Sequence, residues 1–268
     1  MDFSDAQAQR LTQLYSDGER EILGELAKAL MKGNSTRNLK VVLNNVQTIR
    51  EDLLAGARTW TEQALPAAYV EGMNEAGMGA VTSIGALHQQ AMLVLAENTY
   101  QRMVYVDQVI GRRTDDIYRN LALENIRGSV AGFQTWKQVA QAYREKLADK
   151  GITGFTDSMG REWSMKTYSE MVARTSTRET MLKGTANRLL EHDIDLVEIT
   201  GGVSEKTCEA CEKWVGQVVS LTGKTDGYPT LAEAEDEGLF HPNCIHSYAA
   251  AISFEEAIEE AKGEEEAD

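Results

Sequence analysis

The sequence predicts a mainly α-helical protein, in which an extended helical N-terminal region precedes a small α+β C-terminal domain stapled by zinc. Three observations support this fold class. Apolar residues recur at helical spacing through most of residues 1–150, short β-prone pieces begin near residue 151, and all three cysteines lie close to two of the four histidines. We therefore expect a helical region over 1–150, a metal-binding domain over 151–252 and an acidic tail over 253–268.

The first two predicted helices should pack as a helical hairpin. Ser4-Asp5-Ala6-Gln7 is typical of a capping box, and leucines and isoleucines then recur at steps of three and four residues until Gly33-Asn34. A second periodic stretch covers 36–65, and Pro66 marks its end or a kink because proline disfavours helix in the residue before it.

The glycine-rich stretch 72–79 is expected to be a break or hinge, since glycine weakens a helix unless the backbone must approach a neighbour closely. Helical periodicity returns over 84–110, again over 115–129, and in a short helix over 135–150. We interpret four methionines of this region as core fillers. They are Met73, Met78, Met92 and Met103.

A change of pattern at 151–163 predicts a β-hairpin and marks our candidate domain boundary. Ser164 should cap the next helix, and a second capping box at 176–179 is expected to restart it toward Leu190. Strands over 197–200 and 218–221 should pair, with the first pair of metal ligands at their turn. Thr230 should cap a short acidic helix ending at Gly238, and Ser253 a final one.

The candidate metal ligands form two close-spaced pairs. Cys208 and Cys211 make a CxxC pair, and His241 and Cys244 have the same gap, which is how structural zinc sites gather four tetrahedral ligands. His246, which follows Cys244 after one intervening residue, is a substitute fourth ligand. A redox pair, a Cys208–Cys211 disulfide and free thiols remain alternatives.

We expect this zinc to be structural, not catalytic. Five candidate ligands can close the coordination sphere, and neither an HExxH motif nor the zinc-deaminase arrangement occurs in the sequence.

The formal net charge of −15 argues against broad nucleic-acid binding, because neutralising phosphates requires clustered Lys and Arg. Eight carboxylates against Lys262 fall within 255–268, so this tail carries about half of that charge. No apolar run of about 18 residues predicts a membrane helix, and the opening residues lack a basic leader region. We expect synthesis and folding in the cytosol and no membrane partner.

One set of motifs, in the order in which they occur along the chain, is similar to the motif pattern of a known family. It comprises Tyr168-Ser-Glu-Met171-Val-Ala-Arg174-Thr175, Cys208-x-x-Cys211, Trp214, Gly216 and His241-Pro-Asn-Cys244-Ile-His246. This order resembles the minor capsid and head-morphogenesis proteins of tailed bacteriophages, the Mu F-like group, over roughly residues 151–250. The resemblance implies a non-enzymatic virion component that acts at the portal vertex in head assembly, with further roles in DNA packaging or ejection. Relatives often have Cys at the position of His246, which supports a metal role there.

The implied partners are the portal protein and the major capsid protein, with several copies of the chain in an assembly and DNA as a further partner. Arg174 and Arg178, at i and i+4 on one helix, and the pair Arg112-Arg113 are candidate contacts with the portal or with DNA phosphates. Ion pairing with Glu170 or Glu179, or a solvated loop, is the simpler interpretation. A zinc-ribbon nucleic-acid-binding module is the alternative function, and a zinc or thiol enzyme is a third.

Overall fold

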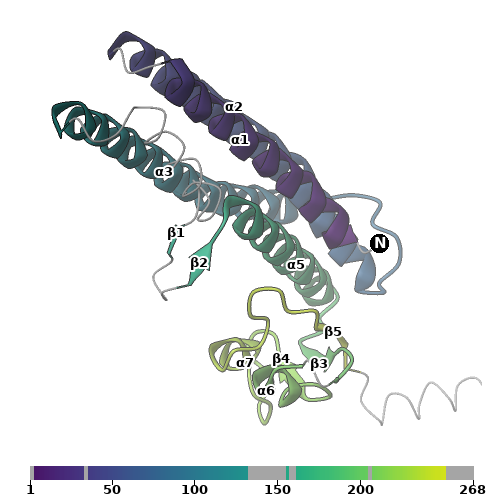
Figure 1. Cartoon of the computed structure of the whole chain (residues 1–268). Helices are drawn as coiled ribbons and strands as arrows, with labels where there is room; N and C mark the ends of the chain where they lie inside the picture. The colour runs from purple at the N-terminus through teal and green to yellow at the C-terminus, as the bar shows by residue number, and fades with distance from the viewer. Residues whose placement is uncertain (1–2, 33–35, 132–154, 157–160, 205–206, 252–268) are drawn as a thin grey trace, which may run out of the picture. The chain divides into compact units, whose positions relative to one another are not determined.

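The computed structural model describes residues 3–32, 36–131, 155–156, 161–204 and 207–251, and Figure 1 shows their elements. The helices are α1 (Phe3–Lys32), α2 (Thr36–Glu75), α3 (Ala86–Ala131), α5 (Met165–Glu191), α6 (Glu209–Glu212) and α7 (Leu231–Asp236). The strands are β1 (Phe155–Thr156), β2 (Glu162–Trp163), β3 (Leu196–Thr200), β4 (Val218–Ser220) and β5 (Ser247–Ala250). The described part of the chain is thus mainly helical with short strands, as predicted.

Packing divides the chain into two compact units. Unit 1 comprises Met1–Leu65 and Leu93–Ser176, and unit 2 comprises Pro66–Met92 and Thr177–Asp268. The divisions therefore fall inside α2, α3 and α5. The boundary predicted at residues 150 and 151 lies outside the described residues and stays a prediction, as do the helices expected over 135–150 and after Ser253.

In unit 1, α1 and α2 lie side by side as the predicted hairpin (Figure 1). The indole Nε1 of Trp60 donates to the backbone carbonyl of Gln7 at 3.0 Å, which joins the two helices. The buried stripe of α1 follows the helical spacing seen in the sequence, and it includes Ala8, Leu11, Tyr15, Ile22 and Leu26. The end of α1 at Lys32 and the start of α2 at Thr36 agree with the prediction, but Ser4 lies inside α1 and is not the N-cap that the sequence predicted.

Pro66 lies inside α2, so of the two alternatives predicted for it the helix end was wrong, and the kink stays a prediction. An internal proline removes one hydrogen bond and costs about 3 kcal/mol. The neighbouring residues Leu65, Ala68 and Tyr69 are fully buried, and their burial offsets that cost. The helix ends at Glu75, and the left-handed Gly77 and Gly79 form the break that the sequence placed over 72–79.

The long helix α3 is continuous where the sequence predicted two helices, over 84–110 and 115–129. The gap between them contains Gly111, at which an added Cβ would lie 2.5 Å from the guanidinium of Arg50. That guanidinium pairs with Asp107 through two contacts of 2.7 and 2.9 Å, which fastens α2 to α3 within unit 1. Gly111 is therefore a place of close approach inside one helix and not a helix end.

The predicted hairpin over 151–163 is present as the antiparallel pair β1–β2, and its turn lies outside the described residues. The hydroxyl of Ser164 accepts from the backbone N–H of Thr167 at 3.1 Å, which confirms Ser164 as the cap of α5. The helix continues through 176–179 without the predicted restart. Ser176 and Thr177 are buried within it.

Unit 2 contains a close crossing of α2 and α5. An added Cβ at Gly72 would lie 1.9 Å from the carbonyl oxygen of Met181, and one at Gly184 would lie 2.1 Å from that of Tyr69. The hydroxyl of Thr185 donates to the Gly72 carbonyl at 2.8 Å across this contact. Gly72 thus serves helix packing, while the break expected in this region falls a few residues later.

The sheet of unit 2 has the strand order β4-β3-β5, with both neighbours antiparallel to β3. Pairing of β3 with β4 follows the prediction, and α7 begins with the predicted cap, a complete capping box between Thr230 and Glu233. The strand β5 was missed. Its small and polar residues give little strand signal, and Thr200 pairs with Ser247 at its start.

The buried core of unit 2 joins the helices to this sheet, and it includes Leu182, Leu189, Val197, Ile199, Trp214, Val219 and Tyr248. Of the four methionines predicted to fill the core, Met73, Met92 and Met103 are buried and Met78 packs against this cluster. None of the helices that the structure describes has an apolar stretch of the length that crossing a membrane requires.

Candidate metal centre

The first pair of candidate ligands lies on the connection between β3 and β4. Cys208 is the N-cap residue of the short helix α6, and its carbonyl accepts from the backbone N–H groups of Cys211 and Glu212 at 3.1 and 3.0 Å. Gly216 then adopts a left-handed conformation that returns the chain to β4. Cys211 is fully buried and Cys208 is exposed, so the pair has one inner and one outer thiol.

The second pair lies on a tight turn that leads directly into β5. The backbone N–H of Cys244 donates to the carbonyl of His241 at 2.9 Å, and Asn243 is left-handed with φ 65°. Asparagine tolerates this conformation better than most residues. The turn sets the two-residue spacing of the pair and leaves His246 next to the first residue of β5.

The structure brings the three cysteines and two histidines together in two overlapping groups. Cys208, Cys211 and His241 form one group, and Cys211, Cys244 and His246 form the other, with the ligand atoms of each group within 4.8 Å of one another. Cys211 belongs to both groups. The two sequence segments therefore meet as the spacing argument expected, and these residues could hold a metal ion.

The individual distances resemble the edges of a coordination tetrahedron. The Sγ atoms of Cys211 and Cys244 are 3.7 Å apart, and a zinc ion with bonds of about 2.3 Å to sulfur would hold two sulfurs about 3.7 Å apart. The sulfur–nitrogen distances are 3.1 Å for Cys208 and His241 and 3.3 Å for Cys244 and His246. A tetrahedral edge of this kind is about 3.5 Å. The spacing within each of the three pairs is therefore compatible with ligands of one tetrahedral ion.

The two histidines differ in their surroundings. His241 is exposed, and its Nδ1 lies 2.9 Å from the carbonyl of Pro242, which fixes the tautomer that leaves Nε2 free toward Cys208. His246 is buried, and its Nε2 has no hydrogen-bond partner. An added Cβ at Gly201 would lie 2.6 Å from the ring of His246, so only glycine leaves room for that ring. Both histidines can offer a nitrogen, and the choice between them stays open.

The pKa values of the outer thiol, Cys208, and the inner thiol, Cys211, are shifted in opposite directions. A hydrogen bond from the Cys211 backbone lowers the pKa of Cys208, and the nearby His241 lowers it further, while burial opposes this. Burial, together with the neighbouring Cys208 and Cys244, raises the pKa of Cys211 to about 12. Burial likewise lowers the pKa of His246 and favours the neutral imidazole that metals bind. Crowded thiols of this kind lose their protons when a cation binds between them.

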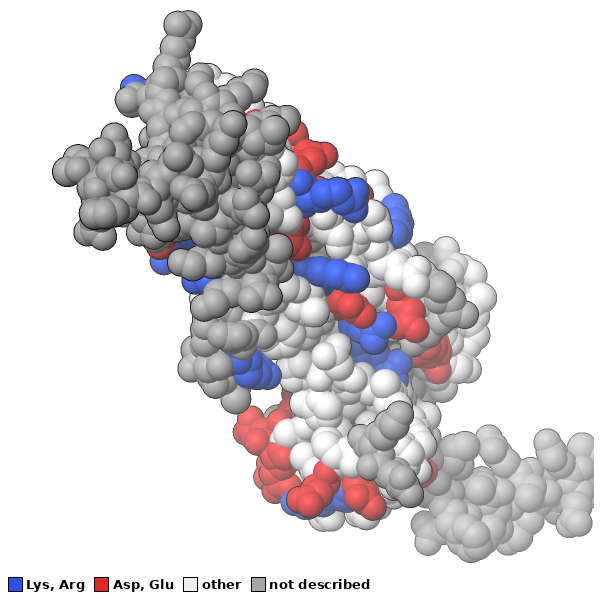
Figure 2. Space-filling model, in the orientation of Figure 1, with Lys and Arg blue, Asp and Glu red and all other residues white. Residues whose placement is uncertain are grey.

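Acidic side chains surround this part of unit 2. Figure 2 shows carboxylates gathered over the end of the unit where α6 and α7 lie. The residues of these two helices and their flanks include Glu209, Glu212, Glu233, Glu235, Asp236 and Glu237. Lys213 pairs with Glu237 within this group. A negative field favours the approach of a divalent cation and disfavours nucleic acid on this face.

The four candidate arginines lie on α3 and α5. Arg174 pairs with Glu170 at 3.2 Å and with Asp5 at 3.4 Å within unit 1. Arg178 donates to the carbonyls of Ile245 and His246 in unit 2. Arg112 and Arg113 are exposed on α3, where Arg112 contacts the carbonyl of Gln108 at 3.4 Å. Their predicted contacts with portal or DNA stay predictions.

Sequence reasoning missed a buried polar chain in unit 2. His88 lies between the hydroxyl of Tyr69, 2.9 Å from its Nδ1, and the carboxylate of Glu191, 2.8 Å from its Nε2. Asn187 donates to the same hydroxyl at 2.6 Å. Because Tyr69, His88 and Glu191 lie far apart in sequence, no motif could have indicated this chain, which links α2, α3 and α5 inside the unit.

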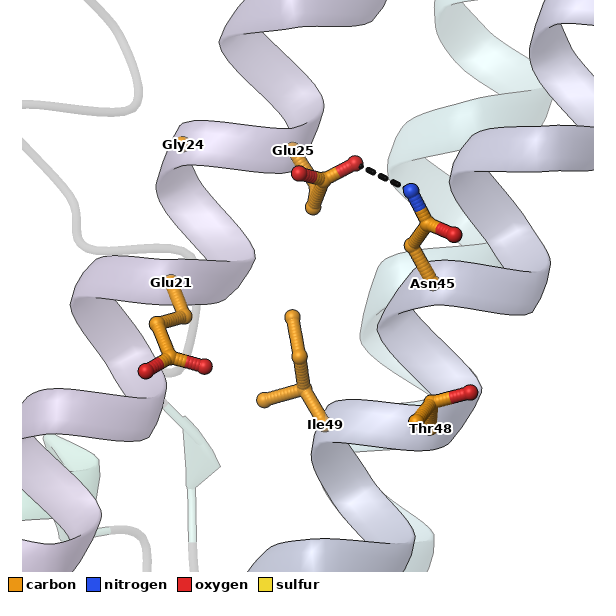
Figure 3. Close-up of a pocket in the computed structure, with 6 residues that line it drawn as sticks. All are labelled: Glu21, Gly24, Glu25, Asn45, Thr48 and Ile49. Atoms are coloured by element: carbon orange, nitrogen blue, oxygen red, sulfur yellow. Dashed lines mark hydrogen bonds between the residues drawn. The ribbon is translucent and has the colours of Figure 1, made fainter.

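A groove also lies between α1 and α2 of unit 1 (Figure 3). It has a volume of about 470 Å³ and is lined by Glu21, Gly24, Glu25, Asn45, Thr48 and Ile49. Asn45 donates to Glu25 across it at 2.7 Å. The lining combines carboxylates with an amide and a hydroxyl and contains no histidine or cysteine, and among the described residues the groups that could hold a metal ion lie in unit 2.

Comparison with known proteins identifies the family. The model of one family, described as phage minor capsid protein 2, matches residues 3–266, nearly the whole chain. Neither a curated protein nor a solved structure matches the chain. The match agrees with the phage minor capsid part of the resemblance found in the sequence, while the Mu F-like part stays a prediction. The chain therefore belongs to the phage minor capsid protein 2 family, and it is in consequence a component of the phage particle.

Proposed function

We propose that this capsid component acts at the portal vertex of a phage head, and that a structural zinc ion staples its unit 2. Phage minor capsid families are typically structural and non-enzymatic. The observation that carries the zinc proposal is the meeting of Cys208, Cys211, His241, Cys244 and His246 at distances close to tetrahedral edges.

The chemistry of the donors favours zinc over harder cations. Thiolate and imidazole groups select zinc, copper or iron–sulfur centres, whereas calcium and magnesium prefer oxygen ligands. The buried His246, whose Nδ1 lies 3.3 Å from the Sγ of Cys244, and the close approach of the Cys211 and Cys244 thiols both fit residues arranged for a cation. When bound, zinc would hold the thiols as thiolates and fix the two ligand segments to each other.

A structural role fits this ligand set better than a catalytic one. Catalytic zinc keeps one coordination position open for water and usually takes three protein ligands. Here five candidate ligands compete for four positions, and they come from two turns next to the sheet. Protein ligands could therefore fill all four coordination positions, and the binding free energy of the ion would contribute to folding.

The portal and capsid partners are inferred from the family and from the surface of unit 1. Leu93, Val94 and Tyr105 are exposed on α3, with relative exposures of 71%, 52% and 48%. Apolar side chains exposed on a long helix are suited to packing against another protein. Arg112 and Arg113 lie on the same helix and could bind DNA phosphates. DNA contact during packaging or ejection is therefore a second candidate role.

The zinc proposal is tested by metal content and by chelation. Protein purified without a polyhistidine tag should contain one zinc per chain by elemental mass spectrometry, and a chelator should lower its melting temperature strongly. Protein that folds fully without metal, and whose melting temperature a chelator leaves unchanged, would overturn the staple.

The portal proposal is tested by binding. Co-expression with the portal protein or the major capsid protein of the same phage should give a complex that co-purifies through size exclusion. Reversing the charge of Arg112 and Arg113 distinguishes portal binding from DNA binding. A variant that loses salt-dependent DNA binding but still forms the protein complex would favour the nucleic-acid function. No complex with either protein would refute a portal-vertex role.

A further inference from the structure

The guanidinium of Arg178 donates hydrogen bonds to backbone carbonyls just after the turn that carries Cys244. Within unit 2 its Nη2 donates to the carbonyl of Ile245 at 2.6 Å and to that of His246 at 3.0 Å, and its Nε lies 3.3 Å from the latter. The guanidinium thus bridges two consecutive carbonyls. These are the carbonyls that follow Cys244 in the chain.

Other contacts hold the two ends of this segment, where the N–H of Cys244 donates to the carbonyl of His241 and Ser247 pairs with Thr200. The side chain of Ile245 is 73% exposed, so it does not anchor the backbone in the core. Asn243, on the other side of Cys244, holds a left-handed conformation that few residues adopt readily. Between these ends, Arg178 on α5 is the side chain that donates to the carbonyls of Ile245 and His246.

The arrangement held in this way is the one a metal would use. The Sγ of Cys244 lies 3.7 Å from the Sγ of Cys211 and 3.3 Å from the Nδ1 of His246. Side chains two residues apart lie on the same face of an extended segment, so Cys244 and His246 can reach one point while the backbone between them stays extended. Gly201 constrains the ring of His246 from its other side.

We propose that Arg178 is a positioning residue of the metal centre, which presets the backbone of residues 244–246 so that Cys244 and His246 face Cys211. This inference rests on the proposed zinc function. Arg178 does not touch the metal, and it acts through the carbonyls of Ile245 and His246. It corresponds to the outer partners that orient ligands in other metal sites.

The experiment measures how fast zinc leaves the full-length protein. Arg178→Met and Arg178→Lys are compared with wild type by transfer of zinc to a chromophoric chelator. Arg178→Met should release zinc about 10- to 100-fold faster, the usual effect of removing such a partner. Arg178→Lys should be intermediate, because one ammonium group keeps the charge but lacks the planar fork. Lys183→Met, an exposed position on the same helix, should release zinc at the wild-type rate.

Two further readouts separate positioning from simple loss of stability. The melting temperature of Arg178→Met should fall by more in the zinc-loaded protein than in protein with chelator, because weaker binding lowers only the loaded form. The absorption spectrum of the cobalt-substituted protein should change in Arg178→Met and not in Lys183→Met.

Equal falls in both melting temperatures, with an unchanged release rate, would overturn the inference and leave Arg178 a purely structural residue. Wild-type protein that takes up no zinc would refute the proposed zinc function itself, and the inference with it, before any variant is made.

Discussion

Gly72→Ala should destabilise unit 2, although alanine is the better helix former. The new Cβ would lie 1.9 Å from the carbonyl oxygen of Met181, whereas carbon–oxygen contacts normally stay beyond about 3.3 Å. The helices α2 and α5 would have to separate by more than about 1 Å. Overpacking of this kind costs about 1–3 kcal/mol, and losing the Thr185 hydrogen bond to Gly72 adds about 1 kcal/mol.

Alanine returns about 1 kcal/mol through its helix propensity, so the net loss of unfolding free energy should be about 2 kcal/mol. The assay is urea unfolding followed by circular dichroism at 222 nm. Gly24→Ala is the matched control, because no atom lies within 4 Å of its added Cβ in the middle of α1. That control should gain about 0.5–1 kcal/mol. A Gly72→Ala midpoint at or above that of wild type would refute the close crossing.

Three other perturbations test separate parts of the fold. Cys211→Ser should abolish zinc binding whichever histidine is the ligand, because Cys211 belongs to both ligand groups, and elemental analysis should find no zinc in it. For Asp195, burial acts to raise the pKa, but hydrogen bonds from Ser220, Thr222 and Thr225 outweigh it and hold the pKa well below its usual value near 3.9. The ionised Asp195 therefore stabilises the folded state above about pH 4, and this stabilisation is lost as the pH falls further. Asp195→Asn should consequently reduce the loss of unfolding free energy at acid pH. Arg50→Lys should cost unit 1 about 1–2 kcal/mol in urea unfolding, since lysine cannot make both contacts with Asp107.

Long periodic helices were the most predictable part of the fold. The stripes of α1 and α2 follow from local spacing, and so do the caps at Ser164 and Thr230, because their hydrogen bonds join residues three apart. Errors arose at Pro66 and Gly111. There, local propensity opposed the helix, and burial or a close contact from a distant residue outweighed it.

The candidate site was predictable as a set of residues but not as a geometry. Spacing identified the five possible ligands, because soft donors in close pairs are uncommon outside metal sites. Spacing could not show that Cys211 would be the shared inner thiol or that His246 would be buried against Gly201. It also could not indicate the partners of Arg178, since only the folded chain brings its guanidinium to carbonyls 67 and 68 residues away.

The topology of unit 2 explains what the ion would stabilise. The connection that carries Cys208 and Cys211 leaves the end of β3, and the turn that carries Cys244 and His246 enters β5 beside that same end, where Thr200 pairs with Ser247. One ion held by both connections would therefore clip β5 to β3 by closing a loop, as a disulfide does. The crossing of α2 and α5 at Gly72 depends on none of these ligands. Loss of metal should consequently free β5 and the turns first, while the helices keep their packing.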